Sequence, residues 1–519
     1  MAFAAMTSAG LSSRLLAPVD RVTAALSNPA RRERAVVVLL LAYVAVWTLY
    51  GALQKGSQDL HFDMSELVVW GREPQLGYWK HPPLAAYVVG LWFLVFPTAD
   101  WAYYLLGMTN AALTLWIAWR IAADYVPDDK RALALVLLTL VPFFNFHALK
   151  FNINTVLLPV WAATTYFFLR SFETRGLVSA AFAGLFAAGA MLGKHWSVFL
   201  LAALGIAALI DWRRVAYFRS AAPWVTAGVG FLALTPHLGW LIRNEFSTFT
   251  FAVGVHGAKP LREVLGGAGE YLAGAAAFVA VPVIFALMAT RSGVSQLRGM
   301  VWPQEPRRRL VAMAFWGPLL LPVVLAPVIG LALTSIWTMS AWSLLTVVLL
   351  SPPGLVADMR ASRAIVAFAM LFPLLMVAAA PVIAMKIHRA GTLSPNQMHS
   401  QLLTERIEKL WRETTNRPLR LVGGDGTLSF AAAFYSPERP SAFPNLNEKE
   451  SPWVDQARID REGLVIVCRT DDRSCLRDLD AFVTKSPAGR RTEVELVRRH
   501  FGEPGRPLRY VIHAIPPRR

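Results

Sequence analysis

Long apolar runs are the feature that most constrains how this chain can fold. Several of them reach the roughly 17–25 residues that an α-helix needs to cross about 30 Å of hydrocarbon. Hydrophobic residues make up 55% of the 519 residues and charged residues only 16%. The runs are apolar throughout, whereas the strands of a membrane barrel alternate in hydrophobicity over about ten residues. The sequence therefore predicts a polytopic α-helical membrane protein.

Most of these runs are long enough to be spans, with boundaries uncertain by several residues. Spans are predicted at 35–53, 101–119, 132–148, 155–170, 177–192, 197–211, 221–241, 268–290, 310–330, 334–350 and 363–385. The apolar segment 82–97 is short, opens with Pro82-Pro83 and ends at Pro97. We expect a re-entrant or surface-lying helix there, or half of a broken helix, which is tolerated where protein buries it. The alternative is a count of about twelve or thirteen spans in place of about eleven.

Basic residues set the predicted orientation. With the N-terminal segment 1–34 in the cytoplasm, roughly twenty Lys and Arg residues lie on the cytoplasmic side and about eight in the opposite loops, which is a strong positive-inside bias. Mostly polar or small residues ending in Arg31, Arg32 and Arg34 precede the first run, so we expect an uncleaved anchor. The net charge of +17 then reflects topology, and no nucleic-acid partner is expected.

From about residue 386 the chain becomes polar and charged. An amphipathic helix is predicted at 399–413, and β-rich runs lie at 419–424, 463–468, 494–499 and 509–515. This composition predicts a small α/β domain of about 130 residues, which the topology places outside the cytoplasm. Its Gly-rich run at 423–426 is predicted to be a turn. Cys468 and Cys475 are the only cysteines; an oxidising compartment permits a disulfide between them, and the alternative is two free thiols.

An acid pair lies in the first predicted outer loop, at 54–82. Asp63 and Glu66 are three residues apart, so on a helix they share one face. A carboxylate there could act as a general base toward an acceptor hydroxyl. The alternative is a solvated amphipathic helix on the membrane surface, in which Glu66 balances Lys55 or Arg72. Asp59 is expected to be only solvated.

Cationic residues follow in the same loop. Lys80 and His81 come after Tyr78-Trp79 and before the Pro-Pro step. A lysine beside a histidine could stabilise a phosphate leaving group, because fixed positive charge replaces the hydration that the phosphate loses. The alternative, which the spacing alone favours, is an interfacial anchor, since Lys, Tyr and Trp are enriched at the headgroup level.

Further polar residues are predicted on the same, non-cytoplasmic side. They are Lys150, Asn152, Asn154, Lys194, His195, His237 and Arg243. Such amides and cations could bind sugar hydroxyls and phosphate charge; the alternative is loop capping and snorkelling. The sequence has no His-x-x-x-His or Cys-rich spacing, and two carboxylates alone would make only a loose divalent-metal site. The sequence therefore does not support a metal site, although a divalent metal stays an alternative, and no soluble nucleotide cofactor is expected.

The order of these motifs resembles glycosyltransferase family 39 of the GT-C superfamily, which includes relatives of protein O-mannosyltransferases and of the lipid A aminoarabinose transferase. The resemblance rests on the acid pair followed by GYWKHPPL at 77–84, and on KFNINTVLLPVWAATTYFFLRS at 150–171, AMLGKHWSVFLL at 190–201, TPHLGWLIRNEFSTFTFA at 235–252 and FYSPERPSAFP at 434–444. It covers most of the chain. It implies a GT-C fold in the inner membrane, with a transmembrane domain at 35–385 and a periplasmic α/β domain at 386–519.

The resemblance also implies an activity. A sugar would be transferred, with inversion, from a polyprenyl-phosphate donor to an envelope glycan or lipid on the periplasmic side. Asp63 matches the proposed catalytic base of the family, with Glu66 as its partner. Lys80 or His81 matches a phosphate-binding lysine of the aminoarabinose branch, and Lys194 matches a recurring lysine.

The chain departs from the family pattern in two places. The two acids are often adjacent in the family, whereas Asp63 and Glu66 are three residues apart. Many members have an aspartate in the second outer loop, where this chain has Asn152 and Asn154. The first departure leaves the individual roles of the acids open, and the second weakens a metal-dependent mechanism.

Three other functions are considered. One is transfer to a protein hydroxyl, as in the O-mannosyltransferases. Another is a flippase or carrier for a polar lipid; carriers bind near the bilayer midplane through broken helices and internal repeats, whereas the ionisable residues here are predicted at one surface. A membrane-anchored sensor acting through the tail would leave the motif at 77–84 unexplained.

Overall fold

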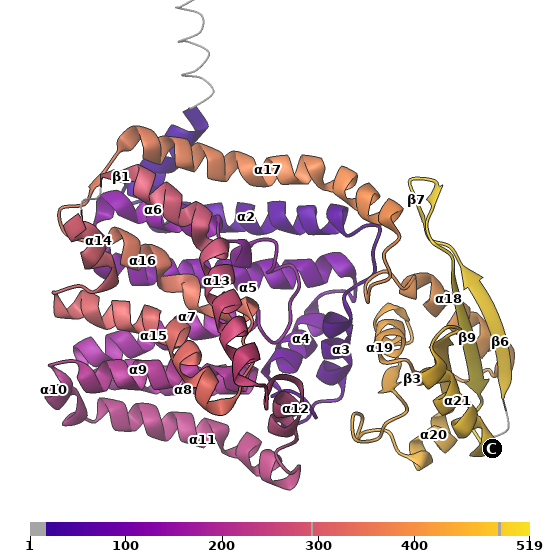
Figure 1. Ribbon diagram of the computed structural model, residues 1–519. Coiled ribbons are helices and arrows are strands. Elements are labelled where there is room, and N and C mark those ends of the chain that lie inside the picture. Colours follow the sequence, from indigo (N-terminus) through magenta and orange to yellow (C-terminus); the bar gives the residue numbers. More distant parts are fainter. Residues whose placement is uncertain (1–16, 292–293, 486–488, 519) are drawn as a thin grey trace, which may run out of the picture. The chain divides into compact units, whose positions relative to one another are not determined.

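The computed structural model describes residues 17–291, 294–485 and 489–518, and its helices and strands are labelled in Figure 1. The chain forms two compact units. The first comprises Met1–Thr48, Lys80–Pro82 and Leu105–Met376, and the second comprises Leu49–Trp79, Pro83–Tyr104 and Val377–Arg519. The second unit therefore contains the tail together with most of the first predicted outer loop.

Long apolar helices dominate the chain, as the sequence predicts. Within the described residues, six helices are long and apolar enough to cross a membrane: α2 (Arg32–Gln54), α5 (Asp100–Tyr125), α11 (Ala222–Arg243), α13 (Leu261–Ala289), α15 (Pro306–Ile329) and α17 (Met359–Ala390). A polytopic helical membrane protein is thus confirmed, while the total of about 11–13 spans stays a prediction.

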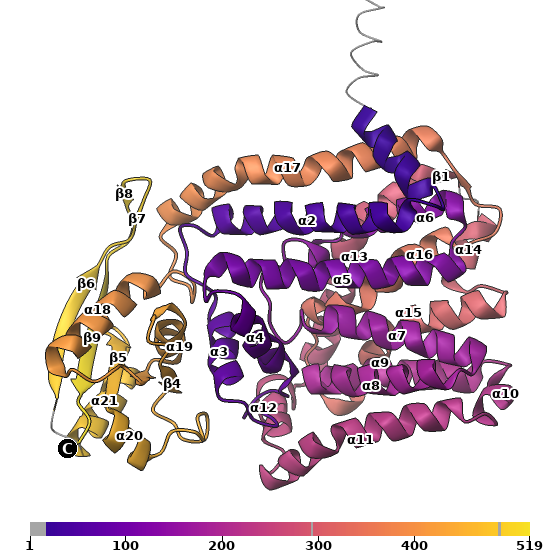
Figure 2. The same cartoon turned by 180° about the vertical axis from the view of Figure 1, so that it is seen from behind.

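Shorter helices complete the first unit. They are α6 (Asp128–Thr139), α7 (Leu157–Thr174), α8 (Leu177–Gly193), α9 (Val198–Ile210), α10 (Arg214–Phe218), α12 (Ser247–His256), α14 (Val294–Val301) and α16 (Leu345–Leu350), with the 3₁₀ turns η1 (Pro142–Phe144), η2 (His195–Ser197) and η3 (Ser335–Leu344) and a short ladder of β1 (Thr290–Arg291) and β2 (Val356–Ala357). Helices α7, α8 and α11 lie side by side (Figure 2). At Gly184 a Cβ atom would lie 2.3 Å from the carbonyl oxygen of Thr226, so only glycine lets α8 and α11 approach this closely.

Two predicted spans are not continuous α-helices. The run 132–148 forms α6, which ends at Thr139, and then the 3₁₀ turn that begins at Pro142. Proline lacks the N–H that would continue the helix and clashes with the preceding turn. The run 334–350 is a 3₁₀ helix over its first ten residues and an α-helix only from Leu345.

The second unit begins with two short helices packed on each other, α3 (Phe62–Arg72) and α4 (Leu84–Val95). Their backbones meet at Gly71 and Gly90, where a Cβ atom on either residue would lie 2.7 Å from backbone of the other. Twelve residues of α4 span about 18 Å, which is less than the thickness of the hydrocarbon core. As predicted, the segment 82–97 is not a full span.

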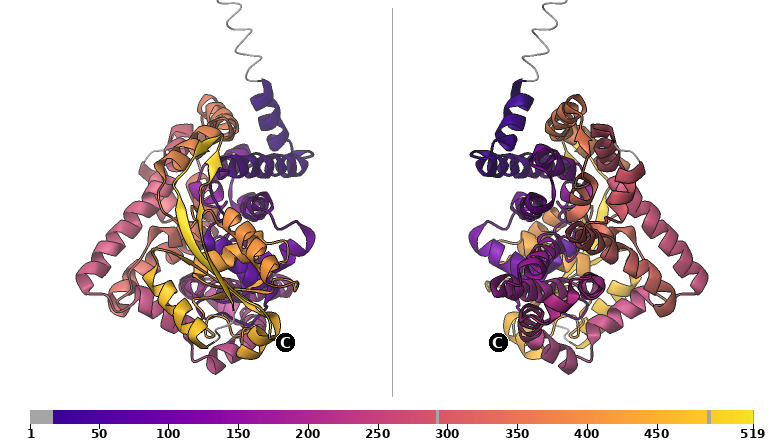
Figure 3. Two further views of the ribbon diagram at one scale, coloured as in Figure 1. Left: turned by 90° about the vertical axis from the view of Figure 1, so that its right-hand side faces the viewer. Right: turned by 90° about the vertical axis from the view of Figure 1, so that its left-hand side faces the viewer.

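A five-stranded sheet organises the tail. Its order is β4 (Ser441–Pro444), β3 (Leu421–Gly424), β5 (Leu464–Arg469), β9 (Leu508–Ile515) and β6 (Arg490–Leu496), with the first three parallel and the last two pairs antiparallel. Its twist is visible in Figure 3. The helices are α18 (Ser400–Thr414), α19 (Gly426–Tyr435), α20 (Gln456–Glu462) and α21 (Arg473–Lys485), and β7 (Arg499–His500) pairs with β8 (Glu503–Pro504). The predicted α/β domain is confirmed; β4 and the three helices after α18 were not predicted individually.

Strand β5 has apolar side chains on both of its faces, which explains why helices cover both faces of this sheet. Val465 and Val467 pack into one core with residues of α18 such as Trp411. Leu464 and Ile466 point to the other face and pack with residues of α20 and α21. Successive strand residues point to opposite faces, so a strand that is apolar at every position needs cover on both sides.

The Gly-rich turn after β3 is the start of a helix. Asp425 caps α19, because its carboxylate accepts a hydrogen bond from the backbone N–H of Leu428 at 3.0 Å. Gly424 has φ +99°, and a Cβ atom there would lie 2.2 Å from the carbonyl oxygen of Val467. Glycine is therefore required by the turn itself.

Candidate functional site

The acid pair lies on helix α3 of the second unit. Asp63 is in the first turn of α3, and Glu66 follows one turn later on the same helix. His61 caps this helix: its Nδ1 accepts the backbone N–H of Asp63 at 3.2 Å, and the same nitrogen lies 3.8 Å from Oδ1 of Asp63. The ring of His61 therefore positions the first turn of α3 beside Asp63.

The two acids differ in exposure. The Asp63 side chain is 29% exposed, whereas Glu66 is buried at 4%. Asp63 is therefore the more accessible carboxylate of α3, and Glu66 is the more constrained one.

Tyr78 supports α3. Its ring stacks on Trp70 with centroids 4.3 Å apart, and its hydroxyl donates to the carbonyl oxygen of Trp70 at 2.6 Å. The side chain is buried at 3%. These contacts fix the loop between α3 and Lys80.

Lys194 is the best-defined cation of the first unit. It lies in the turn between α8 and η2, and its ammonium donates to Oδ1 of Asn154 at 2.8 Å. The same nitrogen lies 4.7 Å from the centre of the Trp337 ring, a cation–π contact. Burial lowers the pKa of Lys194 from 10.5 to about 7, because a charge is costly away from water. An anionic ligand in contact with this nitrogen would reverse that cost.

His81 lies close to the same cations. Burial lowers its pKa well below 6.5, and the positive charges of Lys80 and Lys194 lower it further. Its ring contacts that of Phe251 edge-on at 6.0 Å. At neutral pH His81 is thus an uncharged donor or acceptor beside two lysines.

Two further histidines extend this region. The rings of His195 and His237 stack at 5.5 Å, and His195 also stacks on Phe249 at 4.4 Å. Nε2 of His195 is 3.0 Å from the hydroxyl oxygen of Thr248. The structure therefore brings together residues from three loops or turns and from helix α11 of the first unit. We call Lys80, His81, Asn154, Lys194, His195 and His237 the cation cluster.

The other predicted polar residues have different surroundings. Oδ1 of Asn152 accepts the backbone N–H groups of Asn154 at 2.9 Å and Thr155 at 3.2 Å, which forms a local turn. That turn presents Asn154 toward Lys194. Lys150 is partly buried just before this turn, and Arg243 is exposed at the end of α11.

Sequence reasoning missed several of these contacts. Trp337 lies in η3, about 140 residues beyond Lys194, and no motif links the two. The sequence did not single out His61, although it lies just before α3, where a capping residue is expected. The expectation for Asp59 was wrong: its side chain is fully buried, pairs with Arg498, and accepts the backbone N–H of Ser400 at 3.0 Å.

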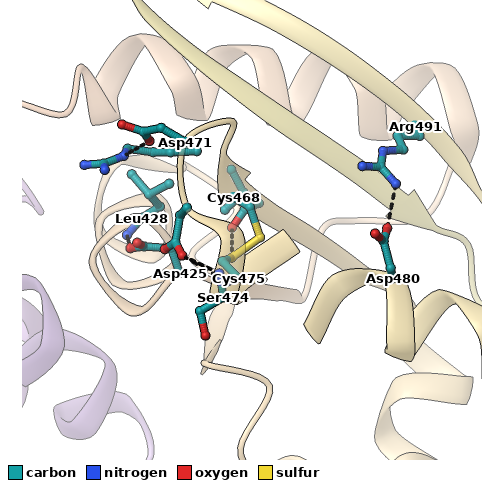
Figure 4. Close-up of a disulfide and its surroundings, with 11 residues drawn as sticks. Asp425, Leu428, Cys468, Asp471, Ser474, Cys475, Asp480 and Arg491 are labelled. Carbon is teal, nitrogen blue, oxygen red and sulfur yellow. Dashed lines mark hydrogen bonds and ion pairs between the residues drawn. A yellow bond between two sulfur atoms is a disulfide. The ribbon is translucent and has the colours of Figure 1, made fainter. Parts of the chain in front are cut away.

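The two cysteines of the tail are bonded. Figure 4 shows the disulfide between Cys468, on β5, and Cys475, in the first turn of α21. Its Cα atoms are 5.7 Å apart, within the usual range. The bond joins the end of the central strand to the helix that covers it.

Comparison with known proteins now adds to the geometry. The family described as dolichyl-phosphate-mannose-protein mannosyltransferase matches residues 80–240. That match begins at Lys80 and includes every member of the cation cluster. No curated protein is similar enough in sequence to count as a relative.

Two solved structures are similar over nearly the whole chain. The crystal structure of ArnT from Cupriavidus metallidurans bound to undecaprenyl phosphate has a TM-score of 0.60 at 12% identity, covering 92% of this chain and 97% of that one. The apo structure of the same protein gives 0.59 at 10% identity with the same coverage. The chain has a GT-C fold. The predicted fold and the resemblance to GT-C glycosyltransferases are thereby confirmed, and substrates and sidedness stay proposals.

Proposed function

We propose that this chain is a membrane glycosyltransferase. It would transfer a sugar with inversion from a polyprenyl phosphate to a glycan or lipid acceptor on the periplasmic side of the inner membrane. The GT-C fold supports this proposal, as does the undecaprenyl phosphate bound in a structure of similar fold. The isoprenoid tail of the donor would lie among the apolar helices, with its phosphate at the polar loops.

The cation cluster is the observation that carries the proposal. The ammonium group of Lys194 donates a hydrogen bond to Asn154 and packs on the ring of Trp337, but its burial disfavours the charged form. A buried cation without a compensating anion is expensive. A bound anionic substrate would offset this cost. The similar fold that binds undecaprenyl phosphate suggests a phosphodiester as that anion.

The reaction can be balanced with residues of this chain. The acceptor oxygen forms a bond to the anomeric carbon, and its proton passes to the carboxylate of Asp63. The bond between that carbon and the phosphate oxygen breaks, and its electron pair stays on the phosphate. Lys194 and Lys80 stabilise the negative charge that develops there, and the neutral ring of His81 can donate a hydrogen bond to it.

Donor consumption in purified protein tests this proposal. The full chain in lipid nanodiscs is incubated with undecaprenyl-phosphate mannose or undecaprenyl-phosphate aminoarabinose and extracted envelope glycolipids, and released undecaprenyl phosphate is measured by mass spectrometry. We expect release that Lys194→Ala slows by about 100-fold. Lys409→Ala, an exposed lysine on α18, is the matched control. If neither donor is consumed, or if the lipid only crosses the bilayer intact, the chain is not this enzyme.

A protein acceptor is the second candidate, because the family matched at 80–240 is described by transfer to protein. Adding periplasmic protein extract instead of glycolipid to the same assay separates the two acceptors. The sugar of the donor is labelled for this purpose. Label that migrates with polypeptide on a denaturing gel, and that protease treatment removes from the band, would favour a protein acceptor. Metal independence stays a prediction, and unchanged turnover after EDTA treatment would support it.

A further inference from the structure

A second polar cavity lies in the second unit, apart from the residues assigned above. Its volume is about 450 Å³, within the range of small-molecule sites. None of the acid pair or the cation cluster lines it. Its lining residues are Ala52, Lys55, Gly56, Gln58, Asp100, Trp101, Tyr104, Gln401, Leu402, Glu405, Arg498 and Arg499.

The charges around this cavity nearly balance. Arg498 is already paired with the buried carboxylate of Asp59. The other charged lining residues are two cations, Lys55 and Arg499, and two acids, Asp100 and Glu405. A multiply charged anion would meet the two carboxylates as well as the cations. The lining therefore favours a polar ligand without net charge.

Asp100 lines this cavity and has one unsatisfied hydrogen-bond acceptor, which its surroundings enclose. Its Oδ2 accepts the hydroxyl proton of Tyr435 at 3.2 Å, and the Tyr435 oxygen accepts the backbone N–H of Leu60 at 2.7 Å. Its Oδ1 is buried and has no hydrogen-bond partner. A buried acceptor left unsatisfied is costly, so a donor from a ligand would stabilise the site. A hydroxyl group is such a donor.

An aromatic ring stands beside these polar groups. Trp101 is 46% exposed, although a large aromatic side chain gains most when it is covered. The C–H face of a pyranose ring is apolar and packs on an aromatic face, while its hydroxyls stay free for hydrogen bonds. Gln58 and Gln401 add both amide donors and carbonyl acceptors.

We propose that this cavity binds a neutral pyranose unit, and that this unit belongs to the acceptor glycan. The ring would pack on Trp101, and one hydroxyl would donate to the Asp100 carboxylate after a rotation of that side chain turns Oδ1 toward the cavity. The hydrogen-bonded chain from Asp100 through Tyr435 ends at Leu60, three residues before Asp63. Occupancy is thereby linked to the start of the helix that carries the candidate base. The assignment to the acceptor rests on the proposed function; the binding itself does not.

Saturation-transfer NMR tests the binding without turnover. The full chain in nanodiscs is mixed with methyl α-D-mannopyranoside, methyl β-D-glucopyranoside or inorganic phosphate. We expect saturation of at least one glycoside, with ring C–H protons strongest, and at least fivefold weaker signal in Trp101→Ala and Gln401→Ala. Both altered side chains are exposed, so the fold should survive. Trp224→Ala removes a more exposed tryptophan from α11 and should leave the signal unchanged.

Each outcome decides the proposal. No saturation of either glycoside, equal signals in Trp101→Ala and wild type, or displacement of the glycoside by millimolar phosphate would overturn it. Asp63→Asn should bind the glycoside normally while losing transfer. If donor consumption fails but Trp101-dependent binding persists, the proposed reaction is wrong and the saccharide site stands.

Discussion

The acid pair and the cation cluster are built in opposite ways. Asp63 and Glu66 come from adjacent turns of one helix, so their shared face follows from their spacing. The cation cluster takes residues from three loops or turns and from helix α11, and Lys194 is oriented by Asn154, 40 residues away. A local pair can be altered one residue at a time, whereas the cluster depends on the packing of several helices. The two regions should therefore respond differently to substitution.

The largest expected effect is at the acid pair. Asp63→Asn removes the base but keeps the size of the side chain, so turnover should fall by about 10³-fold while donor binding changes little. Initial rates of undecaprenyl phosphate release, with donor affinity measured separately, check this. Asp478→Asn, an exposed aspartate on α21, is the matched control. A loss of donor affinity as large as the loss of rate would show that Asp63 binds the donor instead.

In the cation cluster, substitution should affect donor binding as well as the rate. Lys194→Ala is expected to lower turnover by about 100-fold and also to weaken donor binding, because the lysine contacts phosphate before and during the reaction. Lys194→Arg keeps the charge but changes its geometry, so it should recover only part of the rate. Steady-state kinetics on both variants measure this. Full activity in Lys194→Ala would remove the residue from the site.

Proton binding offers a sharper test of the same lysine. In the ligand-free protein burial holds the pKa of Lys194 at about 7, so the cation is present below that pH and is lost as pH rises. The donor phosphodiester stays anionic throughout. Donor affinity should therefore be constant at acidic pH and fall above pH 7, by at most about tenfold per unit. Titration calorimetry from pH 5.5 to 9 tests this, and Lys194→Arg should flatten the profile.

The smallest expected effect on activity is in the tail. The double variant Cys468→Ser, Cys475→Ser removes a crosslink that closes a short loop, which should cost about 2 kcal/mol of stability. Thermal unfolding should shift downward by a few degrees, with turnover at 25 °C nearly unchanged. A large loss of turnover at 25 °C in folded protein would instead connect the tail disulfide to the reaction.

Features of the fold that depend on neighbouring residues could be predicted from the sequence, whereas contacts between distant residues could not. The lengths of α2, α13 and α15 follow from apolar runs, and the tail strands follow from β-rich segments. The break after Thr139 was not foreseen, although Pro142 signalled it locally. The pairing of Asp59 with Arg498 could not be predicted from the sequence, because more than 400 residues separate them and neither lies in a recognisable motif.

The candidate site divides in the same way. The residue types and their order at 77–84, 150–154 and 194–196 were enough to predict a phosphate-binding function by resemblance. The contacts of Lys194 with Asn154 and Trp337 required the structure. So did the saccharide cavity, whose lining comes from the start of α5, the start of α18 and a hairpin near the C-terminus.

The sequence by itself determined that this is a helical membrane protein with a polar α/β tail, because the hydrophobic effect acts on composition and periodicity, which any window of the chain displays. The tertiary structure alone decided which polar side chains share an environment. A buried charge or an unsatisfied oxygen is defined by what surrounds it, and in this chain those surroundings come from segments hundreds of residues apart.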